Sequence, residues 1–413
     1  MQSPVASLSM ALPTVNEVPR SSVRLSVQGP SERVVDDVCG IVLAGRPQWG
    51  ESHFERVLRG PLLPIAQTPL IRYPLEWMRA GGITSAVICC NSASNSVQAY
   101  LGGGAGVGLR LDYTSDVEPR GPAGCAHDAM QLSSARTFLV VEGAVFPSLD
   151  LRILLEAHRR SGAVATVVAE IDRRRRALAG EALRHPGGVF LFERRAIAGV
   201  SARGYHDIKQ GLLEKLYQAG ERVMTHEVQG ISPRVLDFPT YSTVSRWLIA
   251  RTVEHPVFLT DYVPMPGGLR HPSAFVDPSA RIVGPVLLAA DARVEAGAVL
   301  VGPASVGAGS VIGRNAVVSR TSVWDRCLVG SSAVIDASLL TDHTVILSGA
   351  RVNGTVELAS DAVLTAPRPI WGPAHRGTPR HFPGATPAMR RGSALAPAHA
   401  LTMTHGGVET RAI

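Results

Sequence analysis

The sequence predicts two successive folded regions, a doubly wound α/β domain and a parallel β-solenoid. Between Val38 and about residue 251, short apolar runs alternate with segments of helical period. From Val276 onward, aliphatic residues recur every six positions instead. Continuous apolar strands joined by crossover helices predict a mostly parallel sheet that is covered on both faces. A period of six fits neither an α-helix nor a hairpin, whereas the flat faces and corners of a β-solenoid require it.

In the first region, strands and helices are expected in alternation. We expect strands at Val38–Leu43, Ala86–Cys90, Leu109–Tyr113, Thr137–Val141, Ala163–Ala169, Val189–Phe192 and Arg222–Val228. We expect helices at Pro69–Ala80, Asn95–Leu101, Ala123–Leu132, Asp150–Arg160, Asp207–Ala219 and Thr240–Ala250.

In the second region, one large aliphatic residue per hexad is expected to point into the solenoid. The spacing of six holds without a slip at Val276, Ile282, Leu288, Val294, Leu300, Val306, Ile312 and Val318. Four positions after each of these comes a mostly small residue, as solenoid corners require. Trp324 keeps the phase but not the residue type, and after it the phase shifts to Val329 and Ile335.

These patterns divide the chain into five parts. We expect a flexible leader at 1–35, the α/β domain at 36–255, a linker at 256–270, the solenoid at 271–364 and a disordered basic tail at 365–413. The leader mixes Ser, Pro, Val and Arg without a sustained period, and the tail is rich in Pro, Arg, Gly and His.

Composition excludes several classes of protein. With 413 residues, 45% of them hydrophobic and 18% charged, the chain is long and apolar enough for ordinary buried cores. The formal net charge is +7, but residues 366–413 carry six Arg against one Glu, so +5 of it belongs to the tail. The folded part therefore has little excess positive charge, and we expect no nucleic-acid partner.

The cysteines and apolar runs indicate a cellular setting. The five cysteines, Cys39, Cys89, Cys90, Cys125 and Cys327, show no metal-ligand spacing. Buried free thiols fit a reducing compartment. No run of about 18 apolar residues and no basic start before an apolar block is found. We therefore expect a cytoplasmic protein without a membrane partner.

Five motifs of the first region carry a resemblance to a known family. They are Gly40–Gly45, Pro61–Ile71, Glu118–Gly124, Phe138–Gly143 and Gly188–Phe192. In this order they resemble the sugar-phosphate nucleotidyltransferases, or NDP-sugar pyrophosphorylases. The hexads are similar to the hexapeptide-repeat left-handed β-helix that follows the Rossmann-like domain there. The resemblance covers about residues 38–364, and the reaction it implies converts a nucleoside triphosphate and a sugar 1-phosphate into an NDP-sugar and pyrophosphate.

The chain departs from that family at four places. The resemblance implies a Gly-rich loop ending in Thr-Arg, but Arg46–Phe54 lacks the close glycines and that pair. The family's phosphate-binding Lys falls on Gly60, and the chain's only lysines are Lys209 and Lys215. The two aspartates that hold Mg²⁺ fall on Ala144 and Val235. We therefore assign no catalytic residue, no metal ligand and no firm cofactor, with Mg²⁺ implied only if the protein is active.

Possible substitutes for the missing groups remain open. Arg46 and Arg59 offer positive charge, and Glu142 and Asp237 offer carboxylates. Asp237 precedes Phe238-Pro239, so capping of a helix is the favoured role for it.

Nucleotide binding is predicted at two segments expected at the carboxyl ends of strands, where ligands of open α/β sheets bind. These segments consist of Leu43, Ala44 and Gly45, and of Gly121, Pro122, Ala123 and Gly124. The alternative for Gly121 and Gly124 is a tight turn with close packing.

Three functional hypotheses follow. The first is a catalytically degenerate homologue that binds a nucleotide or NDP-sugar, or regulates an active relative, in polysaccharide or glycoconjugate synthesis. The second is a working pyrophosphorylase with substituted residues. The third is a non-catalytic assembly module. In each case we expect a homo-oligomer or a pairing with an active relative through the β-helix. An acyltransferase is disfavoured, because His343 is the only histidine within the repeats and no acyl-carrier insertion loop is found.

Overall fold

The computed structural model describes most of residues 37–364. The described residues are 37–45, 60–91, 95–116, 118–147, 149–171, 184–228, 235, 237–254, 259–354, 357–358 and 363–364. They all belong to one compact unit. The expected leader at 1–35 and the expected tail at 365–413 lie outside the described residues.

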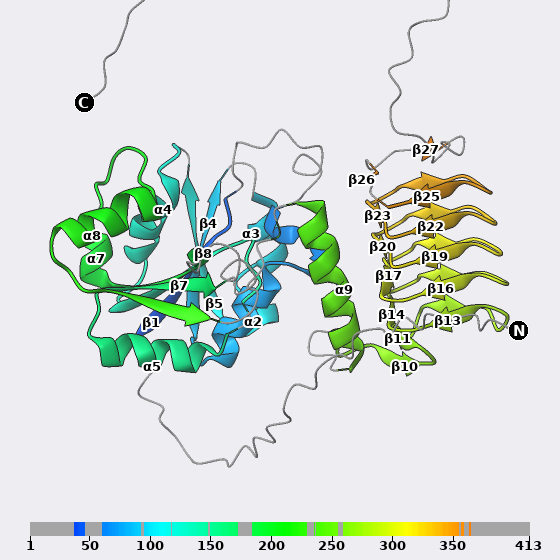
Figure 1. The fold of residues 1–413 in the computed structure, drawn as a ribbon, viewed down its shortest axis with the longest axis horizontal. Helices are drawn as coiled ribbons and strands as arrows, with labels where there is room; N and C mark the ends of the chain where they lie inside the picture. The colour runs from blue at the N-terminus through cyan, green and yellow to red at the C-terminus, as the bar shows by residue number, and fades with distance from the viewer. Residues whose placement is uncertain are drawn as a thin grey trace, which may run out of the picture. The chain divides into compact units, whose positions relative to one another are not determined.

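The first region forms a seven-stranded sheet with the order β5-β4-β1-β6-β8-β7-β9 (Figure 1). The strands are β1 (Val38–Leu43), β4 (Ser85–Asn91), β5 (Arg110–Asp116), β6 (Thr137–Glu142), β7 (Ala165–Ile171), β8 (Arg184–Glu193) and β9 (Val223–Val228). β8 runs antiparallel to both β6 and β7, and all the other neighbours are parallel. The predicted mostly parallel sheet is confirmed.

Helices cover both faces of this sheet. They are α2 (Arg72–Ala80), α3 (Asn95–Leu101), α4 (Gly121–Met130), α5 (Leu151–Ser161), α7 (Arg194–Ala198) and α8 (Glu214–Gln218), whereas α9 (Phe238–Glu254) packs in a separate cluster. Alternate residues of β1 enter two different cores: Val42 lies in the core with α2 and α5, and Ile41 lies in the core with α4 and α7. This two-sided burial is the reason that β1 is apolar at successive positions.

The helix expected at Asp207–Ala219 has an irregular start. Its first part is the π-helix η5 (Ile208–Leu213), and α8 follows directly. The Asp207 carboxylate caps η5 by accepting hydrogen bonds from the amides of Lys209 and Gln210, at 2.6 and 2.8 Å. This cap fixes where the Lys209 side chain leaves the backbone.

The second region is a parallel β-helix with three stacked sheets (Figure 1), as the hexads predict. The sheets have the orders β10-β11-β14-β17-β20-β23-β26, β12-β15-β18-β21-β24-β27 and β13-β16-β19-β22-β25. The strands are β10 (Val263–Met265), β11 (Gly268–Arg270), β12 (Phe275–Val276), β13 (Arg281–Val283), β14 (Val286–Leu288), β15 (Arg293–Val294), β16 (Val299–Val301), β17 (Ala304–Val306), β18 (Val311–Ile312), β19 (Val317–Ser319), β20 (Ser322–Val323), β21 (Leu328–Val329), β22 (Val334–Asp336), β23 (Leu339–Leu340), β24 (Val345–Ile346), β25 (Arg351–Asn353), β26 (Glu357–Leu358) and β27 (Val363–Leu364).

The strand structure starts earlier than the predicted linker allows. Within 256–270, β10 and β11 pair as an antiparallel hairpin, and β11 pairs in parallel with β14. Part of the expected linker is therefore the first layer of the solenoid sheet. The hexad period could not indicate it, because Gly268 and Leu269 precede the first hexad.

The shift in hexad phase after Val318 has a geometric cause. Leu288 aligns with Val306, 18 positions later, whereas Val306 aligns with Val323, 17 positions later. One corner is thus a residue shorter, so Val323 occupies the interior position that the six-residue spacing assigns to Trp324. The same shortening recurs where Val323 aligns with Leu340. The expectation that Trp324 holds the phase is wrong in this respect: Trp324 belongs to a different cluster from the solenoid core.

Helix α9 packs against the outer face of one solenoid sheet. It contacts β14 and β17. The apolar cluster at this junction contains Leu248 of α9 and, from the solenoid, Leu269, Leu287, Trp324 and Leu339. Ser245 of α9 and Ser322 of β20 also hydrogen-bond at 3.0 Å. The outward residues Leu287 and Leu339 of this sheet are apolar because the helix side of the sheet is buried, and the outward Ser322 is buried with its hydroxyl paired. Within the described residues, no helix is long and apolar enough to span a bilayer.

Candidate functional site

The carboxyl ends of β1, β4 and β6 meet at one edge of the α/β sheet. The amide of Ala44 donates to the Cys89 carbonyl, and the amide of Gly143 donates to the Leu43 carbonyl, both at 2.9 Å. The predicted segment Leu43-Ala44-Gly45 therefore continues β1 between its two neighbouring strands. Gly45 is exposed at this edge, as a ligand site at the end of a parallel sheet requires.

The segment 60–71, which begins with η2 (Gly60–Leu62), forms a wall of this edge. A Cβ atom on Gly143 would lie 2.9 Å from the Leu43 carbonyl oxygen and 3.4 Å from Pro61 Cγ. Gly143 thus lets the backbone of β1 and the Pro61 ring approach the end of β6. The Pro61 carbonyl also accepts from the Ile71 amide at 2.8 Å, which ties the wall to the start of α2.

Ala144 and Val235 lie side by side at the same edge. The Val235 amide donates to the Ala144 carbonyl at 2.9 Å, although the two residues are far apart in the sequence. Val235 is 3% exposed and packs in the cluster at the α9 junction. Neither side chain carries an oxygen or nitrogen atom, so this pair supplies no ligand for a cation.

Glu142 and Lys209 form an ion pair at the end of β6. The Lys209 Nζ atom lies 3.9 Å from Glu142 Oε1, with the side chains 37% and 30% exposed. Such a partly exposed pair contributes about 1 kcal/mol or less to stability. The pair therefore keeps the Lys209 ammonium group at this edge. Exchanging the Glu142 carboxylate for another anion as its partner costs little energy.

The second predicted segment lies at the start of α4. Gly121 has φ +72°, and a Cβ there would lie 2.7 Å from the His206 carbonyl oxygen. A Cβ on Gly124 would lie 2.7 Å from Arg120 Cβ. The Ala123 amide donates to the His206 carbonyl at 2.9 Å. These contacts support the tight-turn alternative, and nucleotide binding by Gly121, Pro122, Ala123 and Gly124 stays a prediction.

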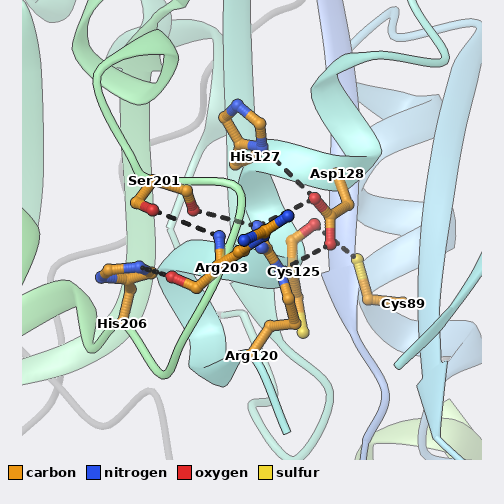
Figure 2. A network of polar contacts seen from close by, with 8 residues as sticks. All are labelled: Cys89, Arg120, Cys125, His127, Asp128, Ser201, Arg203 and His206. Carbon is orange, nitrogen blue, oxygen red and sulfur yellow. Dashed lines mark hydrogen bonds and ion pairs between the residues drawn. The ribbon is translucent and has the colours of Figure 1, made fainter. Parts of the chain in front are cut away.

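A polar network positions the loop that leads to Lys209 (Figure 2). The Arg120 guanidinium donates to both Asp128 oxygens at 3.0 Å and to the Ser201 carbonyl at 3.3 Å. The His206 amide donates to the Arg120 carbonyl at 2.8 Å. His127 lies 3.2 Å from Asp128 in the same network. Residues 201–206 are therefore fixed on α4, directly before the capped helix that carries Lys209.

Comparison with known proteins agrees with this architecture. The family model described as nucleotidyl transferase matches residues 56–178. A UTP–glucose-1-phosphate uridylyltransferase of Synechocystis is 21% identical over 335 residues, which cover 71% of this chain and 84% of the relative. A glucose-1-phosphate thymidylyltransferase of Streptomyces griseus is 25% identical over 330 residues, covering 73% and 85%. A mannose-1-phosphate guanylyltransferase of Mycobacterium tuberculosis is 28% identical over 107 residues, covering 26% and 30%.

The chain is thus similar, over 71% and 73% of its length, to nucleotidyltransferases that act on sugar 1-phosphates, and its residues 56–178 match the nucleotidyl transferase model. Ala144 and Val235 are the positions at which the motifs place the family's two magnesium aspartates, and their backbone hydrogen bond brings those positions together. The motifs locate these two positions separately, in segments far apart in the sequence. The spatial match strengthens the assignment of both positions.

The described residues of this nucleotidyltransferase homologue do not fit the family's magnesium ion. The substitute Glu142 is paired with Lys209. The substitute Asp237 accepts from the Thr240 amide at 2.8 Å and so caps α9, as favoured from the sequence. No group of three or more His, Cys, Asp or Glu suited to a metal is found where the structure describes the chain. Arg46 and Arg59 lie outside the described residues.

Sequence reasoning missed Lys209 as a residue of this edge. Lysine occurs only twice in the chain, but the family's motif places its phosphate-binding lysine at Gly60. The available signal was Asp207, whose capping position two residues before Lys209 fixes the start of a helix. Which strand end that helix faces depends on the crossover from β8, and periodicity does not encode it.

Proposed function

We propose that this protein binds a nucleotide or NDP-sugar at the carboxyl edge of β1, β4 and β6, without the metal-dependent transfer reaction of its family. The observation that carries the proposal is the adjacency of Ala144 and Val235. The two positions at which the family has its magnesium ligands lie together and both hold aliphatic side chains. The whole magnesium centre is therefore missing, and not only one of its ligands.

The magnitude of this loss is large. Attack of a sugar phosphate on a triphosphate requires that the developing phosphate charge be neutralised. Removal of one such electrostatic group typically lowers the rate by about 10² to 10³. The rate losses from removing several groups that act as a unit do not multiply in full. Removing all of them nevertheless leaves the reaction at least as slow as removing one.

Binding makes smaller demands, and the edge meets them. Lys209 supplies an ammonium group for a phosphate, and Glu142 holds that group in place when no ligand is bound. The exposed Gly45 leaves backbone at the strand end accessible beside Asn91, whose Nδ2 atom would lie 3.3 Å from a Cβ on Gly45. A phosphate that replaces Glu142 as the partner of Lys209 keeps the number of ion pairs unchanged.

The same proposal covers the cellular role. A nucleotide-binding homologue that pairs with an active relative through its β-helix would report nucleotide-sugar supply in polysaccharide or glycoconjugate synthesis. A cytoplasmic setting is supported by the five cysteines, all of which are free thiols and four of which are buried.

The deciding experiment combines turnover and binding. Purified protein is incubated with ATP, GTP, UTP or dTTP, glucose or mannose 1-phosphate, and Mg²⁺, and pyrophosphate release is measured. Thermal unfolding is followed in parallel with the matching nucleoside diphosphates and NDP-glucose sugars. We expect a concentration-dependent rise in melting temperature without pyrophosphate release. Pyrophosphate release at a rate typical of enzymes would overturn the proposal.

A working enzyme with substituted residues is the second candidate, and the carboxylate of Glu142 at the edge favours it. It requires Glu142 to leave Lys209 and bind a metal ion. A nucleotide affinity that depends on Mg²⁺ and is lost in chelator would support this alternative. If no nucleotide changes the melting temperature, the assembly-module hypothesis is favoured.

A further inference from the structure

We propose that Trp324 of the solenoid is a positioning residue for the wall of the nucleotide site and acts through Tyr241. This inference rests on the proposed function only where it concerns nucleotide affinity. Its geometric part, a relay of hydrogen bonds from β-helix to wall, stands on its own contacts.

The relay begins at the short corner of the solenoid. Because Val323 takes the interior position, Trp324 lies in the apolar cluster at the α9 junction and is 5% exposed. Its Nε1 atom donates to the Tyr241 hydroxyl at 2.9 Å. The two rings meet edge to face, with centroids 6.3 Å apart. A tryptophan in the solenoid interior would be overpacked, so the shortened corner both spares the core and presents the indole to α9.

The relay continues through Tyr241 to the wall. Tyr241 is 1% exposed, and its hydroxyl donates to the Pro64 carbonyl at 3.0 Å. Burial raises the pKa of Tyr241, so the hydroxyl keeps the proton that it donates. Trp324 donates to this hydroxyl and Pro64 accepts from it. The Ser245 and Ser322 side chains are further hydrogen-bonding neighbours, so its direction is fixed.

The wall connects this carbonyl to the nucleotide edge. Pro64 lies three residues after Pro61 and begins β2 (Pro64–Ile65). This strand pairs with β3 (Thr68–Pro69). Pro61 packs at Gly143, between Glu142 and Ala144. A shift of Pro64 therefore moves the surface that faces the carboxyl end of β6. The solenoid contributes to the site by holding this wall, in addition to any role in assembly.

Hydrogen exchange of the wall tests the relay without a ligand. The amides of Leu63, Leu70 and Ile71 donate within the segment 60–71 at 3.0, 2.9 and 2.8 Å, and they report its opening. In the full chain, Tyr241→Phe removes both hydrogen bonds of the relay and Trp324→Phe removes one. We expect exchange in 60–71 to be about tenfold faster in Tyr241→Phe and less accelerated in Trp324→Phe.

Thr243→Val is the matched control. It removes an exposed hydroxyl from the same helix and a hydrogen bond to the Pro239 carbonyl, which stays within one turn of α9 and does not reach the wall. We expect exchange in 60–71 to stay at the wild-type rate in this variant. Equal rates in Tyr241→Phe and Thr243→Val would overturn the inference. If Tyr241→Phe fails to fold, the comparison of Trp324→Phe with Thr243→Val decides in the same way.

Nucleotide affinity supplies the second measurement. We expect the Kd for the nucleoside diphosphate that binds the wild type to rise about tenfold in Tyr241→Phe and to be unchanged in Thr243→Val. Accelerated exchange with an unchanged Kd would overturn the positioning role. If the wild type binds no nucleotide, the proposed function fails, while the exchange data still decide whether the relay holds the wall.

Discussion

Replacing Glu142 by Gln is expected to strengthen nucleotide binding, and the sign of the change tests the proposed role of Lys209. Glu142 Oε1 lies 3.9 Å from Lys209 Nζ. A phosphate oxygen that accepts from Nζ at about 2.8 Å lies within ~7 Å of this carboxylate oxygen. At ~7 Å and an effective dielectric constant of about 20 to 40, their repulsion is ~1 to 2 kcal/mol. Its removal corresponds to a Kd that is lower by about 5- to 30-fold.

Isothermal titration calorimetry with ADP, GDP, UDP and dTDP, in EDTA and in Mg²⁺, measures this effect. Glu156→Gln is the matched control, because Glu156 pairs with Arg160 on the exposed surface of α5 and lies in no predicted site. We expect the control to bind like the wild type. Weaker binding by Glu142→Gln, confined to buffers with Mg²⁺, would mean that Glu142 is a metal ligand and would refute the reasoning.

Three further predictions concern single positions. Lys209→Met should raise the Kd for the same nucleotide about tenfold while changing the free energy of unfolding by less than about 1 kcal/mol, because the ion pair is partly exposed; Lys215→Met, the other lysine, should bind normally in calorimetry. Leu287→Ala should lower the free energy of unfolding in urea by about 2 to 5 kcal/mol, because Leu287 is fully buried against α9, whereas the exposed Leu328→Ala should change it by about 0.5 kcal/mol or less. Burial lowers the pKa of His158, so the unfolded chain binds this proton first, and stability should fall as the pH drops below about 6.5; in urea titrations at several pH values, His158→Gln should lose part of this dependence.

Much of the fold could be predicted because the residues that a strand, helix or solenoid buries recur in the sequence at a characteristic spacing. β1 was predicted to the residue because it is an apolar run bounded by polar or small residues, and α3 was predicted to the residue because Val97 and Leu101, four positions apart, are its buried residues. The solenoid interior was predicted through Val318, where each hexad repeats the same geometry. The direction of β8 was not predictable, because burial of both faces looks the same for parallel and antiparallel strands.

The candidate site was only partly predictable. Motif positions located Ala144 and Val235, and helix-start chemistry assigned Asp237 correctly as a cap. Lys209 and Tyr241 were not found, because their roles depend on partners from distant elements, the end of β6 and the wall at Pro64. The phase break at Trp324 was visible in the sequence, but its reason lies in contacts with α9 that no local pattern contains.

The two shortened corners also have a consequence for how the chain finds its fold. If all hexads were identical, a strand could pair with the wrong neighbour, shifted by one hexad, and still bury an aliphatic residue in every layer. Such shifted pairings would be misfolded states of energy similar to that of the native fold. The steps from Val306 to Val323 and from Val323 to Leu340 are 17 residues long, and the step from Leu288 to Val306 is 18. A slipped chain would therefore bring unequal corners into the same column. These two shortened corners therefore favour a single register of the stacked coils over the shifted ones.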